Sequence, residues 1–174
     1  MAAPGVTLSA GLAGGGNSVS ELPEIGLSVR QPWAELVVRG IKLVEVRTWK
    51  CPREMIGKRV VIHAGKKIDS RQFIWKHFPH EEWASVMARV GGLVGEVTIS
   101  DCIKFTCHGH FAEYRPVHLN QIDDYEDGLY GFVMSGAVKY DQIIPCIGRL
   151  GFFKVEKQDI EPDNVGGLQD ELSF

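Results

Sequence analysis

Short β-rich segments separated by glycine and proline turns run along most of the chain, and this pattern limits the fold more than any other feature. Candidate strands cover residues 26–30, 43–49, 58–65, 92–103, 130–140 and 147–156. Each segment is rich in β-branched or aromatic residues and is bounded by turn-forming residues, as is typical of strands. A chain with this many strands must bury them in a sheet or a barrel.

Helical signals are fewer and shorter. One helix is expected to begin at Pro32, because proline suits a first helical turn, and to end at Gly40. Residues 69–89 also have helical character, interrupted at Pro79. Many strands with two or three short helices predict an α+β fold, dominated by a small β-barrel with flanking helices.

Composition divides the 174 residues into three parts. Residues 1–24 are rich in glycine, alanine and serine and carry no charge before Glu21, so we expect a disordered tail. Residues 25–157 form one module, long enough to bury a core. Residues 158–174 are expected to be an acidic C-terminal tail.

The sequence shows no targeting or membrane signal. No apolar run approaches the roughly 20 residues of a membrane span, and the N-terminus lacks the pattern of a secretory signal. A cytoplasmic or nuclear protein without membrane association is therefore expected. The spacing of Cys102, Cys107, His108 and His110 does not match a zinc site, so no metal and no cofactor are predicted.

Charge is unevenly distributed along the chain. Residues 25–157 contain 19 basic and 15 acidic side chains, although the whole chain has a net charge of −3. A mildly basic module suits a polyanionic partner, but an ordinary surface of mixed charge gives the same counts.

The segment GIKLVEVR places three charges in an apolar run. In an extended strand, Glu45 and Arg47 share one face while Val44 and Val46 share the other, which we expect to enter the core. Lys42 precedes the strand and can fold over the charged face. The alternative is a solvated face whose ion pair contributes under about 1 kcal/mol.

A second acidic residue also lies in an apolar candidate strand and needs a polar partner. Glu96 lies in the apolar segment 92–103, where an acid requires either solvent or a cation. We expect Lys42 or Arg47 to supply that cation, if the two strands are neighbours.

These residues resemble those of a known family. The segment GLSVRQPWAELVVRGIKLVEVR resembles the opening of ASCH domains, whose hallmark G-x-K-x-x-E-x-R is matched by Gly40, Lys42, Glu45 and Arg47. The block YGFVMSGAVKYDQIIPCIGRLGFF resembles the end of the same domain. The resemblance covers roughly residues 26–157. It implies a PUA-like β-barrel in which the Lys/Glu/Arg motif lines a cleft.

The resemblance favours a module that binds RNA or another single-stranded nucleic acid. Phosphates would contact basic side chains, and a base would stack on an aromatic ring. The candidate ligand-binding residues are Lys42, Glu45, Arg47, Trp33, Gln31, Arg30, Lys66 and Lys67. Trp33 can equally be a core residue of its helix, and the two lysines can equally be a solvated turn.

The alternative is an enzyme that acts on a nucleoside. Some bacterial ASCH proteins are amidohydrolases that deacetylate N4-acetylcytidine. Carried over from them, the catalytic set would be Lys42, Glu45 and Glu96, with Glu45 standing where those enzymes have a nucleophilic threonine. Hydrolysis would then need a water molecule activated by one of the carboxylates, with Lys42 stabilising the oxyanion.

Overall fold

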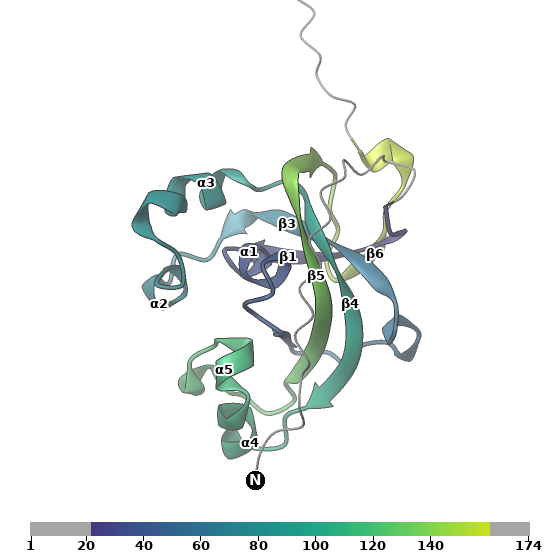
Figure 1. The fold of residues 1–174 in the computed structure, drawn as a ribbon. Coiled ribbons are helices and arrows are strands. Elements are labelled where there is room, and N and C mark those ends of the chain that lie inside the picture. Colours follow the sequence, from purple (N-terminus) through teal and green to yellow (C-terminus); the bar gives the residue numbers. More distant parts are fainter. Residues whose placement is uncertain (1–21, 161–174) are drawn as a thin grey trace, which may run out of the picture.

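The computed structural model describes residues 22–160 and contains one curled sheet of six strands (Figure 1). Most of the tails predicted for residues 1–24 and 158–174 lies outside this range. The strands are β1 (Ile25–Gln31), β2 (Val44–Arg47), β3 (Arg59–Ile68), β4 (Gly92–Lys104), β5 (Tyr130–Pro145) and β6 (Phe152–Lys154). Their order across the sheet is β2-β5-β4-β3-β1-β6.

The sheet is mixed. β1 pairs with β3 in parallel, and the other neighbouring strands are antiparallel. The long strands β4 and β5 bend along their length, so the sheet forms a half-barrel (Figure 1). The predicted α+β class with a barrel-like sheet is confirmed.

The helices are all short and gather on the concave side of the sheet (Figure 1). They are α1 (Trp33–Val38), α2 (Gln72–Trp75), α3 (Trp83–Ala88), α4 (His108–Glu113) and α5 (Arg115–His118). Single 3-10 turns occupy Arg53–Met55, His80–Glu82, Ile122–Asp124 and Lys157–Asp159. In residues 22–160, no helix is long and apolar enough to cross a bilayer.

Helix α1 lies against the middle of the sheet. Its Glu35 side chain is fully buried and meets three cations, those of Arg39, Arg89 and Lys139. A buried carboxylate requires such partners, and here they belong to different segments. The ion cluster therefore fixes α1, and with it the turn that follows, against β5 and the segment before β4.

Helices α4 and α5 lie outside the segments in which the sequence predicted helices. They form because Phe111 is fully buried and packs edge-on against Phe105 at 5.0 Å. The Cys107 thiol also caps α4 by accepting from the backbone N–H of His110. The rings of Phe105 and Phe111 supply the apolar surface of this region, although their neighbours in the sequence are mostly polar.

Two of the three apolar clusters in the described residues pack close to the site. The larger joins α1 to the central strands, through residues such as Leu27, Ile62 and Val97. The smaller contains Phe105 and Phe111 and receives Val44 from β2. Val44 is 2% exposed, whereas Val46 is half-buried and also lines the cleft described below. The predicted facing of β2 therefore holds fully at Val44 and only partly at Val46.

Candidate functional site

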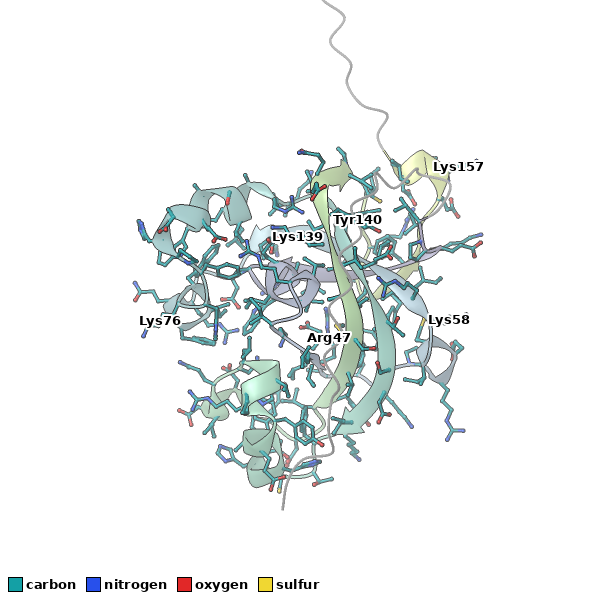
Figure 2. All side chains as sticks on the ribbon, viewed as in Figure 1. Arg47, Lys58, Lys76, Lys139, Tyr140 and Lys157 are labelled. Carbon is teal, nitrogen blue, oxygen red and sulfur yellow. The ribbon has the colours of Figure 1, made fainter. Side chains whose placement is uncertain are left out.

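A cleft of about 940 Å³ opens on the concave side of the sheet. One wall is formed by β1, the end of β3 and the turn that follows it. The other wall includes residues 146–151, between β5 and β6. Trp33, Lys42, Glu45 and Arg47 all line the cleft, so the structure brings the predicted motif together. Arg47 lies near the centre of the molecule (Figure 2).

The cleft is strongly cationic. The basic residues that line it are Arg30, Lys42, Arg47, Lys66, Lys67, Arg71 and Arg149, whereas the acidic ones are Glu45 and Asp69. Seven cations against two acids leave an excess of five positive charges among the lining residues, and an excess of three once Asp124 and Asp159, the ion-pair partners of Arg71 and Arg149 outside the lining, are counted. Charges of one sign in a concave site reinforce each other's field, so the cleft attracts anions.

Lys42 lies at the floor of the cleft. Gly40, with φ +70°, ends the α1 segment and turns the chain so that Lys42 points inward. Its side chain is 1% exposed, and its Nζ donates to the carbonyl of His118 (2.5 Å) and to Asn120 Oδ1 (3.4 Å). Glu45 Oε2 lies 3.5 Å away, so each of the three ammonium hydrogens has an acceptor. Burial lowers the pKa of Lys42 from 10.5 to about 8, and Glu45 partly opposes this shift.

Glu45 stands between the two cations of the motif. Its Oε1 forms an ion pair with Arg47 Nη2 at 3.1 Å, and its Oε2 forms one with Lys42 Nζ at 3.5 Å. Arg47 Nη2 also donates to the carbonyl of Ser28 at 2.7 Å, which ties β2 to β1 across the cleft. The expectation that Lys42 folds over the Glu45–Arg47 face agrees with these distances.

Trp33 forms part of the floor and is mainly buried, at 7% exposure. Its indole Nε1 donates to Asp69 Oδ2 at 3.0 Å. One ring face is covered by Lys42 Nζ, 4.6 Å from the ring centroid. Trp33 is therefore both a packed residue and a lining residue, and the two sequence interpretations are compatible.

The outer wall carries cations without partners. Strand β3 bulges beside β1, because the register shifts between Arg30 and Gln31 and leaves Lys66 and Lys67 as additional residues. Arg30, Lys66 and Lys67 are exposed and line the cleft. Within residues 22–160 these three side chains form no ion pair.

Two of the candidate residues lie elsewhere. Gln31 is fully buried beside the cleft: its Oε1 accepts from the backbone N–H of Glu35, and its Nε2 donates to the carbonyl of Arg89. Its polar groups thus hold α1 in place.

Glu96 pairs with Arg59 at 2.8 Å and accepts from the Tyr140 hydroxyl at 2.7 Å. Tyr140 is well separated from Arg47 in Figure 2. Glu96 does not line the cleft, and the expected pairing of Glu96 with Lys42 or Arg47 is wrong. The physical reason is the strand order, since β5 lies between β2 and β4.

His63 is a further lining residue, outside the predicted ligand-binding set. Its Nε2 donates to the carbonyl of Cys146 at 3.0 Å, and its Nδ1 lies 3.2 Å from the hydroxyl of Ser28. Burial lowers the pKa of His63 below its usual value. Gly148 packs on the ring so closely that a Cβ there would overlap it. His63 thereby holds the loop 146–151 that forms the second wall.

No metal site accompanies these groups in the part of the chain that the structure describes, where no three His, Cys, Asp or Glu side chains converge on one point. Cys102 lies beside Cys51, and its Sγ accepts a hydrogen bond from the backbone N–H of Cys51 at 3.4 Å. Cys107 instead caps α4. The cysteines and histidines that suggested a cluster are therefore used separately.

A curled mixed sheet with short helices and a charged cleft on its concave side is the architecture of a PUA-like domain. The model of the ASCH domain family matches residues 27–143, which is more than half of the chain. The chain therefore belongs to the ASCH domain family. Among proteins with curated functions, no significant match was found.

Solved ASCH structures show the same fold. The ASCH protein from Zymomonas mobilis is 14% identical, with a TM-score of 0.50, covering 79% of this chain and 90% of that one. A tyrosine-to-phenylalanine variant of that protein gives a TM-score of 0.54, also at 14% identity, with 79% and 93% covered. At this identity the likeness concerns the fold alone.

Proposed function

We propose that the cleft binds single-stranded nucleic acid, RNA above all. The observation that carries this proposal is the excess of positive charge in one cavity, which is three charges after the paired acids Asp124 and Asp159 are counted. Phosphate contacts by Lys and Arg supply most of the affinity in such complexes. A volume of about 940 Å³ suits a nucleotide or a short unpaired segment.

The cations divide into two groups with different tasks. Arg30, Lys66 and Lys67 are exposed and unpaired within the described residues, so they are available for the sugar–phosphate backbone. Lys42 and Arg47 are already engaged by Glu45 at the floor, where a base would enter. The backbone would follow the β1–β3 wall, and a base would point inward beside Trp33.

Salt dependence tests the proposal directly. Labelled single-stranded RNA is titrated with the protein at several salt concentrations, and binding is followed by fluorescence anisotropy. The Lys66→Ala/Lys67→Ala variant should bind more weakly and lose about 1.4 from the slope of log K against log salt, since each single-strand phosphate contact contributes about 0.7. Lys58→Ala is the matched control, because Lys58 is exposed and lies at the edge of the molecule, away from Arg47 (Figure 2).

Equal effects per charge removed, in the double variant and in the single-charge control, would contradict the proposal, because binding would then reflect overall charge. Absence of RNA binding by the unmodified protein would do so as well. Single-stranded DNA of the same sequence, titrated in parallel, identifies which sugar is preferred.

Hydrolysis of N4-acetylcytidine receives less support from the geometry. Glu96 is bound to Arg59 and Tyr140, and the ammonium of Lys42 has all three hydrogens engaged. Glu45 remains as a carboxylate at the floor of the cleft. A deacetylation assay on acetylated cytidine, with Glu45→Gln as the comparison, tests this activity independently of RNA binding.

A further inference from the structure

The two acids of the cleft differ in their free hydrogen-bonding capacity. An ionised carboxylate offers about four acceptor positions. Asp69 accepts hydrogen bonds from Trp33 Nε1 and from the backbone and guanidinium N–H groups of Arg71. Asp69 is therefore saturated and has nothing left for a ligand.

Glu45 is only half used. Each of its oxygens has one partner, Arg47 for Oε1 and Lys42 for Oε2. Its side chain is 10% exposed, and that residual exposure belongs to a residue that lines the cleft. One acceptor position per oxygen thus remains for a donor that enters the cleft.

Asn120 places a donor beside this acceptor pair. Its Oδ1 must be the atom that faces Lys42 Nζ at 3.4 Å, because an ammonium group only donates. The Nδ2 group therefore keeps two N–H donors, and residues 22–160 supply no acceptor for them. The backbone N–H of Asn120 donates to His118 Nδ1 at 2.9 Å, which holds the residue in place. Because Glu45 and Asn120 bind the same ammonium, they are neighbours on the floor.

The floor thus presents two adjacent acceptors followed by a donor. Among the bases, only guanine carries the complementary order on its Watson–Crick edge: the N2 amino group, the N1–H and the O6 acceptor. Resting on the proposed function, we infer that the cleft selects a guanine base, with N1–H and N2–H on Glu45 and O6 on Asn120 Nδ2.

The other bases each oppose the carboxylate with a lone pair. Adenine offers one amino group beside the acceptor N1, and cytosine offers one amino group beside the acceptor N3. Uracil places its single N3–H between two carbonyls. A carboxylate held against any of these edges meets an acceptor and loses one of its two hydrogen bonds.

The experiment uses the full chain and single-base changes in an otherwise constant RNA. The probes are labelled hepta-uridine RNAs whose central base is guanine, adenine, cytosine, uracil or hypoxanthine. Hypoxanthine keeps N1–H and O6 but lacks the N2 amino group. The guanine probe should bind at least tenfold more tightly than the others, and hypoxanthine should lose about tenfold, since a hydrogen bond to a charged group is worth about that factor.

Two variants test the residues. Glu45→Gln replaces one acceptor with a donor, so the guanine preference should disappear while the RNA still binds. Asn120→Ala should weaken guanine and hypoxanthine probes equally, because both carry O6. Glu113→Gln, an exposed carboxylate outside the cleft lining, should keep the wild-type preference.

The outcomes separate this inference from the function on which it rests. Equal, salt-sensitive binding of all five probes overturns the guanine inference and leaves nucleic-acid binding intact. A guanine preference that persists unchanged in Glu45→Gln also overturns it. Failure of every probe to bind overturns both proposals. Because the hypoxanthine comparison uses the unaltered protein, it holds even if a variant fails to fold.

Discussion

The buried ammonium of Lys42 makes the stability of the protein depend on pH. Its pKa is about 8 in the folded protein, whereas an unburied lysine titrates at 10.5. The unfolded chain therefore keeps the Lys42 proton to higher pH than the folded protein does. The buried charge lowers the free energy of unfolding at neutral pH, and this loss is recovered as the pH rises from 8 to 10.5. At about 1.4 kcal/mol per pKa unit the full cost is about 3 kcal/mol, of which about 2 kcal/mol is relieved between about pH 7 and about pH 9.5.

Comparison with Lys42→Met measures this relief, because methionine fills the buried volume without a titrating group. Free energies of unfolding are obtained by urea denaturation of both proteins at the two pH values, under reducing conditions. Relative to the variant, the wild-type protein should gain about 2 kcal/mol at the higher pH. Burial raises the pKa of Cys51 to about 11, which destabilises both proteins equally as pH rises and cancels in the difference.

The control is Lys58→Met, which removes a lysine from an exposed position. Its unfolding free energy should follow the wild-type pH dependence. If the Lys42→Met protein also parallels the wild type at both pH values, Lys42 does not carry a desolvated charge, and the account of the cleft floor is wrong.

Two further pairs of substitutions test the packing around the cleft. Val44→Asp should cost about 4 kcal/mol of unfolding free energy, because it buries an unpaired charge. Val46→Asp, at a half-buried position, should cost about 1 kcal/mol. Similar losses for the two variants in urea denaturation would contradict the facing of β2. Gly148→Ala should cost about 1–3 kcal/mol because its Cβ would overlap the ring of His63. Adding His63→Ala should recover part of that loss, and simple additivity of the two would argue against the contact.

The sequence predicted the fold because its signals are local. Alternating strands and glycine turns placed all six strands, although the last shortened to β6. Gly40 was correctly expected to end the first helix, and it has a positive φ. The α4 and α5 helices were not predicted, because Phe105 and Phe111 lie among polar residues and become a core only against Val44.

The site was predictable only where its residues are close in the chain. Lys42, Glu45 and Arg47 follow from one strand and the turn before it. Asn120 and Arg149 line the same cleft although they are far from the motif in the sequence. No local sequence pattern indicates that they belong to the site. Glu96 was assigned the wrong partner for the same reason. An acid in an apolar strand indicates a cationic partner, but the strand order decides that this partner is Arg59.

The burial of the Lys/Glu/Arg motif assigns affinity and selectivity to different residues. Lys42 and Arg47 form ion pairs with Glu45 and donate to backbone carbonyls, so they stabilise a carboxylate inside a cationic cleft, while Arg47 Nε has no hydrogen-bond partner within the described residues. The long-range attraction then rests on the exposed wall, chiefly Lys66 and Lys67. Wall substitutions should therefore lower the salt slope without changing base preference, whereas Glu45→Gln should change the preference and leave the slope nearly intact. A slope that falls as much in Glu45→Gln as in the lysine double variant would show that the motif itself contacts phosphate.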